Sequence, residues 1–248
     1  MSSFVLGLHG GWGARFSMLG AAFLQTAKSN RNLRVYWDHQ YPCAWAEISD
    51  YPLELVGASE WQDLQKWSSV RDWRVGDLTW SDEVEGMEEF DQVSVSATCI
   101  PRNAGFSFSD AIQAFKSRVS LARVAERSIF KGLDAESMIG VHIRGTDYDE
   151  AKELSPPHLF RAAMQEYPPG TSFFVCTDAP EIGEAVDTWG FRVQQAPYAS
   201  RRSSEGLFTD LDVLLTLARC KKVLGCPVSS FARFAAAWGN TTLQVVSH

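Results

Sequence analysis

The pattern of apolar and polar residues divides the chain into short strands that alternate with helices. Three short segments rich in apolar residues, at residues 138–141, 172–176 and 221–226, have the pattern of buried strands. Residues 4–8 and 33–37 have the pattern of two further strands, and the segment between them carries apolar residues at helical spacing. Strands that alternate with helices favour parallel sheets, because parallel strands need a crossover connection. The pattern therefore predicts an α/β protein.

Three predicted helices indicate how the chain is organised. A long amphipathic helix is expected from Ser109 to Lys131, and the turn at Gly132 after it suggests a domain boundary. A second amphipathic helix is expected from about Asp210 to Cys220. A third begins at the serines after residue 228 and ends at a Gly-Asn pair, which are typical start and stop signals. We therefore expect two domains, residues 1–133 and 134–248.

The most informative polar residues directly follow the strand at residues 138–141, in the segment GVHIRGTD (140–147). Side chains alternate along a strand, so His142 and Arg144 share one face. Ligands of open α/β sheets bind outside the carboxyl ends of the strands, and a guanidinium there suits a phosphate or diphosphate because it donates two hydrogen bonds at once. A structural alternative is an Arg-Asp salt bridge with a hydrogen-bonded core histidine.

Two other predicted strands also end in polar residues. Thr177 and Asp178 follow the strand at residues 172–176, and Ser229 and Ser230 begin the helix after the strand at residues 221–226. A helix N-terminus presents backbone N–H groups and a positive dipole end, so it attracts anions. Simple capping by the serines needs no ligand. Because the carboxyl ends of parallel strands converge, the polar residues of all three strands together favour an anion site.

Three segments resemble the C-terminal motifs of a fucosyltransferase superfamily. They are GVHIRGTDY (140–148), FFVCTD (173–178) and TDLDVLLTLARCKKVLGCPVSSFARFAAAWG (209–239). This superfamily includes the α-1,6-fucosyltransferases, the bacterial nodulation fucosyltransferases and the protein O-fucosyltransferases. The resemblance implies a GT-B-like fold, with two Rossmann-like domains whose mainly parallel sheets face a cleft. It also implies an inverting, metal-independent enzyme without a cofactor, which transfers fucose or a related sugar from a GDP-sugar to a glycan or other hydroxyl acceptor.

The resemblance also implies roles for individual residues. The N-terminal domain would lie on the acceptor side and the C-terminal domain would bind the nucleotide sugar. Arg144 would bind the diphosphate, His142 the nucleotide, and Asp212 the guanine, with Asp210 as an alternative to Asp212. The implied donor-binding residues are Gly10, Gly11, Gly13, Arg15, His142, Arg144, Thr177, Asp178, Asp212, Ser229, Ser230 and Phe231. The four N-terminal residues belong to a glycine loop after the first strand, and a tight turn without a ligand is the alternative explanation for its glycines.

Two departures from the family pattern concern catalysis. The α-1,6 enzymes carry a second arginine directly after the first, where this chain has Gly145. The catalytic base also has no clear counterpart. We expect catalytic roles for Arg144, Asp147 and Glu150, and Asp149 and Glu153 are further acidic candidates for the base. Alternatively, a loose oxocarbenium-like transition state would need little help from a base. A catalytically inactive nucleotide-sugar-binding protein of the same fold is the alternative function.

Composition and charge narrow the possible binding partners, metal sites and cellular location of the protein. The net charge of −7 argues against a nucleic-acid or anionic-membrane partner. The first apolar run is too short for a signal peptide or a membrane span. The five cysteines are scattered, and so are the five histidines, which favours reduced thiols in a cytoplasmic protein and offers no metal-ligand cluster. Tryptophans between residues 40 and 105 are either core residues or an acceptor surface: Trp45, Trp61, Trp67, Trp73 and Trp80.

Overall fold

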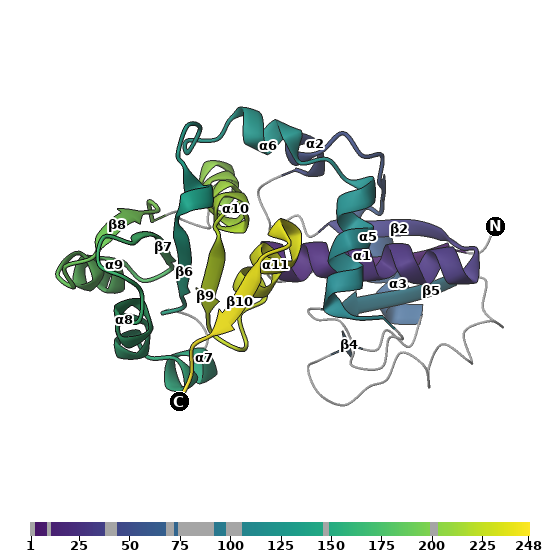
Figure 1. The fold of residues 1–248 in the computed structure, drawn as a ribbon. Coiled ribbons are helices and arrows are strands. Elements are labelled where there is room, and N and C mark those ends of the chain that lie inside the picture. Colours follow the sequence, from purple (N-terminus) through teal and green to yellow (C-terminus); the bar gives the residue numbers. More distant parts are fainter. Residues whose placement is uncertain are drawn as a thin grey trace. The chain divides into compact units, whose positions relative to one another are not determined.

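A computed structural model shows two compact units, Met1–Ala122 and Arg123–His248, here called the N-terminal and C-terminal units. The structure describes residues 3–8, 11–37, 44–67, 72–73, 92–97, 106–145, 149–198 and 203–248. Each unit contains a five-stranded parallel sheet (Figure 1). The α/β class with parallel sheets is therefore confirmed. The division lies after Ala122, whereas the sequence suggested Leu133.

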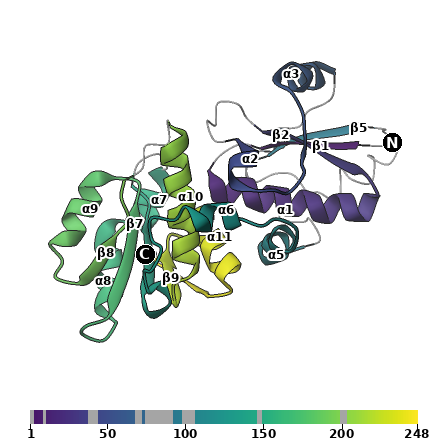
Figure 2. The same cartoon turned by 90° about the horizontal axis from the view of Figure 1, so that it is seen from above.

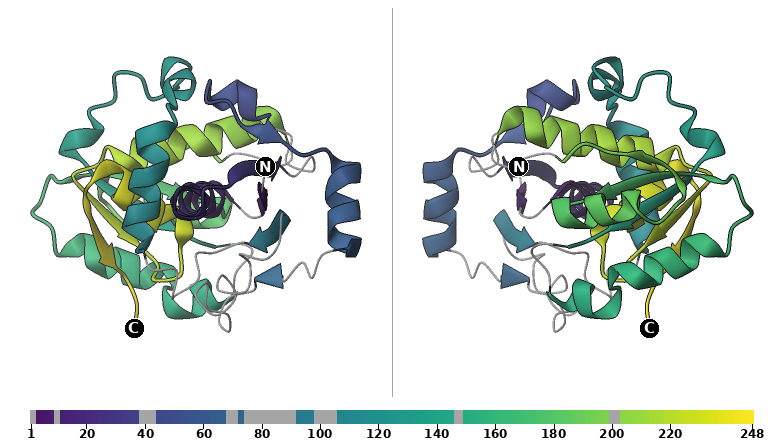
Figure 3. Two further views of the ribbon diagram at one scale, coloured as in Figure 1. Left: turned by 90° about the vertical axis from the view of Figure 1, so that its right-hand side faces the viewer. Right: turned by 90° about the vertical axis from the view of Figure 1, so that its left-hand side faces the viewer.

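The N-terminal unit is a sheet covered by helices on both faces. Its strand order is β3-β2-β1-β5-β4. The strands are β1 (Ser3–Leu8), β2 (Asn32–Trp37), β3 (Glu54–Leu55), β4 (Asp72–Trp73) and β5 (Gln92–Ala97). The helices are α1 (Trp12–Ser29), α2 (Trp45–Ile48), α3 (Ala58–Trp67) and α5 (Phe108–Arg118). Helices α1 and α5 lie on one face and α3 on the other (Figures 2 and 3).

Close packing defines both faces of the N-terminal sheet. On the α3 face, the rings of Tyr36 and Trp61 stack with centroids 5.0 Å apart, beside Val5. On the opposite face, Phe16 of α1 stacks on Phe115 of α5 at 4.6 Å. The two helices meet at Gly20, where an added Cβ would collide with the backbone of α5. A larger residue there would force these helices apart.

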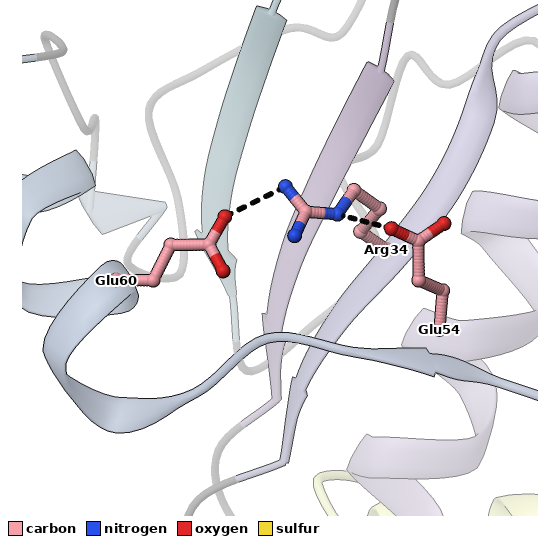
Figure 4. Close-up of polar contacts among 3 residues, drawn as sticks. All are labelled: Arg34, Glu54 and Glu60. Carbon is pink, nitrogen blue, oxygen red and sulfur yellow. Dashed lines mark hydrogen bonds and ion pairs between the residues drawn. The ribbon is translucent and has the colours of Figure 1, made fainter.

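Arg34 ties β2 to two neighbouring elements on the α3 side of the sheet (Figure 4). Its Nε atom lies 2.7 Å from Glu54 Oε1 on β3, and its Nη1 atom lies 2.7 Å from Glu60 Oε1 on α3. The hydrogen bond to Glu60, followed by the other contacts with the two carboxylates, raises the pKa of Arg34. The glutamates are solvent-exposed, so each pair contributes at most about 1 kcal/mol.

The predicted helix from Ser109 to Lys131 is wrong in length. Helix α5 ends at Arg118, because Val119 adopts an extended conformation. A separate short helix, α6 (Ala122–Glu126), begins where Ser120 Oγ accepts a hydrogen bond from Ala122 N. Ile129, which the periodicity placed on the apolar stripe, is 62% exposed. Local capping by serine therefore overrides the helical periodicity here.

The C-terminal unit has the strand order β10-β9-β6-β7-β8, which is the order of a Rossmann-type sheet. Its strands are β6 (Ile139–Ile143), β7 (Ser172–Thr177), β8 (Arg192–Gln195), β9 (Lys222–Gly225) and β10 (Thr242–Val245). Its helices after α6 are η2 (Ala135–Ser137), α7 (Asp149–Leu154), α8 (Pro157–Gln165), α9 (Pro180–Asp187), α10 (Ser204–Ala218) and α11 (Ser230–Gly239).

Helices cover both faces of this second sheet (Figure 1). Val141 and Ile143 of β6 pack in one apolar core with residues of α8 and α9. On the other face lie α10 and α11, which meet closely at Gly239. Helix α10 starts at Ser204, capped by Ser203, and not near Asp210 as expected. Helix α11 has the predicted serine N-cap, Ser229, and the predicted left-handed Asn240 at its end.

Candidate functional site

The candidate site of the C-terminal unit lies where the strand order reverses. Strand β6 pairs with β7 on one side and with β9 on the other, and the connections from these strands run in opposite directions along the sheet. The gap outside the carboxyl ends at such a reversal is the usual ligand site of an open α/β sheet. His142 and Arg144 stand at the end of β6, and Ser229 follows β9. Topology therefore brings together residues that are far apart in sequence.

His142 is the centre of a buried contact set at this point. It is 4% exposed and lies on the α11 side of the sheet, opposite Val141 and Ile143, as strand alternation predicted. Its Nδ1 atom is 3.1 Å from Ser229 Oγ, and its ring stacks on Phe231 with centroids 4.8 Å apart. Ser229 is 1% exposed, and its Oγ also accepts a hydrogen bond from Ala232 N at 3.1 Å. The serine therefore joins the end of β6 to the first turn of α11.

The segment around Arg144 is held by the end of β7. Gly145 N donates a 2.6 Å hydrogen bond to Asp178 Oδ1, and Thr177 Oγ1 accepts one from Ala179 N at 3.2 Å. Both predicted residues thus shape the turns beside the strand ends. Arg144 itself is partly buried and interacts with the protein, although its Nε atom makes no hydrogen bond within the described part of the chain.

Gly145 occupies a space that admits no side chain. A Cβ atom built on it would lie 2.6 Å from Ile182 Cδ1 and even closer to Ala179 Cβ, at the start of α9. An arginine at this position would therefore require the backbone to move. The departure from the family pattern is consistent with the packing of this chain, and nothing in the sequence pattern indicated these two α9 contacts.

The two acids of α10 differ in their surroundings. Asp212 is 3% exposed, and its Oδ2 accepts a 2.8 Å hydrogen bond from Ile129 N, so it anchors the segment before β6. Asp210 is partly buried and acts electrostatically on Cys176, which pairs with His142 across β6 and β7. Both acids lie inside the helix, so the expectation that they begin it is wrong. Asp210 is the acid whose charge reaches the residues beside His142.

Helix α7 carries the acidic candidates that the structure describes. Glu150 and Glu153 are exposed, and Asp149 Oδ1 pairs with Lys152 Nζ at 2.6 Å, which lowers the pKa of Asp149. The end of α7 is held in place by Ser155, the residue directly after it, whose Oγ donates a 2.6 Å hydrogen bond to Val246 O. Asp147, which was expected to be catalytic, lies outside the described residues.

The predicted glycine loop leads into α1 of the N-terminal unit. Gly11 is the N-cap of α1, with φ −77°, and a Cβ atom built on it would meet nothing within 4 Å; Gly13 is buried in the first turn. The backbone at Gly11 therefore does not itself require glycine. Arg15 is 1% exposed, and its guanidinium lies 5.2 Å from the ring centroid of Trp37. Gly10 lies outside the described residues.

Of the five tryptophans between residues 40 and 105, the two whose side chains the structure describes belong to the core of the N-terminal unit. Trp45 and Trp61 are 4% and 3% exposed, so the acceptor-surface interpretation is wrong for these two. The side chains of Trp67, Trp73 and Trp80 lie outside the described part. Within the described ranges, no three histidine, cysteine or acidic side chains gather as a metal site, and no helix is long and apolar enough to cross a membrane.

The fold matches solved fucosyltransferase structures. NodZ from Bradyrhizobium is similar at a TM-score of 0.64 and 18% identity, over 95% of this chain and 92% of that one. A mutant of Arabidopsis thaliana FUT1 in complex with GDP is similar at a TM-score of 0.65 and 12% identity, over 98% of this chain and 70% of that one. POFUT1 in complex with GDP is similar at 0.55 and 14% identity, over 99% and 98%. No protein-family model matches, and no curated protein matches significantly. The chain thus has the same overall fold as these three solved structures.

Proposed function

We propose that this protein, which shares its fold with NodZ, FUT1 and POFUT1, is a glycosyltransferase that uses GDP-fucose or a related GDP-sugar. NodZ and POFUT1 have each been crystallised with GDP and with GDP-fucose, and a mutant of FUT1 with GDP. The observation that carries the proposal is the contact of His142 with the first turn of α11 at the strand-order reversal, with Arg144 two residues after His142 in the chain. An arginine and a helix N-terminus supply the positive field that a departing diphosphate needs.

In the proposed reaction, the acceptor hydroxyl oxygen bonds to the anomeric carbon as the bond from that carbon to the diphosphate oxygen breaks. Attack from the face opposite the leaving group inverts the anomeric centre. Arg144 holds the diphosphate, and the backbone N–H groups at Ser230 and Phe231 face the same phosphates. Thr177 and Asp178 act indirectly, because they fix the turns beside Arg144. Gly10, Gly11, Gly13 and Arg15 would contact the donor sugar.

The acceptor proton needs a base, which we assign to the acidic segment after Arg144. Asp147 and Glu150 are the candidates, since the carboxylate of Asp149 is paired with Lys152. For base recognition, the two oxygens of a carboxylate accept the N1–H and exocyclic amine hydrogens of guanine. Asp212 is 3% exposed and its Oδ2 accepts a hydrogen bond from Ile129 N, whereas Asp210 is only partly buried, so we assign this role to Asp210. Charge neutralisation by Arg144 and α11 makes a metal ion unnecessary.

Calorimetry of GDP binding tests the nucleotide site. Arg144→Lys keeps the charge but loses the planar fork, which should cost on the order of 1.5–3 kcal/mol of binding free energy, a loss of roughly 10- to 150-fold in affinity. Arg161→Lys is the matched control, because Arg161 is an exposed residue of α8 on the opposite face of the sheet. Equal GDP affinities of wild type and Arg144→Lys would remove Arg144 from the site.

Incubation with GDP-fucose and a panel of glycan acceptors tests the chemistry. Transfer of the sugar, with release of GDP, supports the proposed enzyme. Donor binding without transfer or hydrolysis would instead identify a nucleotide-sugar-binding protein of the same fold. The crowded Gly145, which excludes the second arginine of the α-1,6 enzymes, is the observation that favours this second candidate. Failure to bind any GDP-sugar would overturn both candidates.

A further inference from the structure

We infer that Ser229 is a positioning residue that fixes the proton of neutral His142 on Nε2, and that it does not itself contact the donor. The functional consequence of this inference rests on the proposed function, because the ligand of His142 would be the proposed nucleotide sugar. Its structural basis is separate. It lies in the hydrogen bonds of one buried hydroxyl group, which bridges β6 and α11.

The hydroxyl of Ser229 has one hydrogen to donate and two lone pairs to accept with. One lone pair accepts Ala232 N–H, which is the N-cap bond of α11. The remaining polar neighbour of Ser229 Oγ among the described residues is His142 Nδ1, at 3.1 Å. If Nδ1 carried a proton and donated it to Oγ, the serine O–H would be a buried donor with no acceptor in the described part of the chain.

A buried donor without an acceptor is costly, and the opposite arrangement avoids that cost. When Ser229 O–H donates to Nδ1, both hydroxyl roles are satisfied and Nδ1 acts as an acceptor. The neutral imidazole must then carry its proton on Nε2. The ring is also held in orientation by its stack on Phe231. His142 therefore carries an N–H at Nε2, and a ligand atom that meets this nitrogen must be a hydrogen-bond acceptor, such as a phosphate, carbonyl or ether oxygen.

The same bonds separate the roles of the two adjacent serines. Ser229 is 1% exposed, and its hydroxyl is used by Ala232 and His142. Ser230 is less buried and is the first residue of α11, so its backbone and hydroxyl remain for a phosphate. The motif therefore combines one serine that acts through the histidine with one that faces the ligand.

Nitrogen-15 NMR of histidine-labelled protein tests the inference without any nucleotide. The chain has five histidines, and the His142→Gln variant assigns the signals of His142. At about pH 8.5, where imidazole is neutral, we expect an unprotonated Nδ1 and a protonated Nε2 in the wild type. Ser229→Ala should release this preference and produce a mixture of tautomers. Ser229→Thr keeps a hydroxyl and an N-cap, and should restore the wild-type pattern.

Ser203→Ala is the matched control, because Ser203 caps a different helix, α10, by accepting a hydrogen bond from Gly206 N in the same way. It should leave the His142 signals unchanged. GDP affinity should fall roughly 5-fold in Ser229→Ala, which corresponds to one neutral hydrogen bond, and recover in Ser229→Thr.

The possible outcomes separate this inference from the proposed function. A proton on Nδ1 in the wild type, or the same tautomer in wild type and Ser229→Ala, would overturn the inference whatever the protein binds. The expected tautomer in a protein that fails to bind GDP would support the positioning role and reject the nucleotide site. If Ser229→Ala does not fold, the wild-type spectrum and Ser229→Thr still decide the question.

Discussion

Replacement of Gly145 by alanine should disturb both stability and nucleotide binding. The new Cβ would lie 2.6 Å from Ile182 Cδ1 and closer still to Ala179 Cβ, whereas ordinary contacts begin at 3.4 Å. Either the backbone after Arg144 or the start of α9 must therefore move by about 1 Å. Overpacking of this kind costs roughly 1–3 kcal/mol of the free energy of unfolding.

The same movement should weaken the hydrogen bond from Gly145 N to Asp178 Oδ1, which holds the turn beside Arg144. We therefore expect a lower GDP affinity as well as a lower stability. Denaturant unfolding without ligand measures the change in stability, and calorimetry at a temperature where the variant is folded measures the change in affinity. Arginine at this position should be no better than alanine, although the α-1,6 enzymes carry it.

Gly57→Ala is the matched control for this experiment. A Cβ atom on Gly57 meets nothing within 4 Å, and its φ does not lie in the left-handed region, so the substitution should be neutral or slightly stabilising. Unchanged stability and GDP affinity in Gly145→Ala would refute the reasoning, because the close packing against α9 would then have no energetic effect.

The polar and sulfur groups of the C-terminal unit support three further predictions. Asp210→Asn should erode the preference for GDP over ADP and UDP in competition binding. Asp212→Asn should mainly lower the unfolding free energy, by about 1–2 kcal/mol, because it weakens the hydrogen bond that Asp212 accepts from Ile129 N. The reverse pattern would assign base recognition to Asp212. EDTA should leave GDP binding and any transfer intact, and loss of activity that manganese restores would contradict the metal-free mechanism. Burial raises the pKa of Cys220 to about 12 from an ordinary value of 9.0, so the unfolded chain ionises first and stability should fall as pH rises from about 9 toward 12. Unfolding titrations at pH 8 and about pH 10.5 should show a smaller loss in Cys220→Ala than in wild type, and equal losses would contradict this assignment.

Local sequence signals were enough to establish the elements and the candidate chemistry of the C-terminal unit. Apolar runs place β6, β7 and β9 within a residue or two, because strands buried on both faces have a strong local signature. Strand alternation alone places His142 on the face opposite Val141. The serine cap of α11 and its Gly-Asn end are likewise local signals, since they depend on the backbone of adjacent residues.

Packing of distant segments settled which of these polar groups meet, and how each is used. Strand order is a long-range property, so only the pairing of β6 with β9 brings Ser229 to His142. Helix boundaries failed where capping competed with periodicity, at Val119 and at the start of α10. The use of Asp212 by Ile129 N and the crowding of Gly145 by α9 depend on residues distant in sequence. Such contacts are set by three-dimensional packing, and no local pattern in a single sequence encodes them.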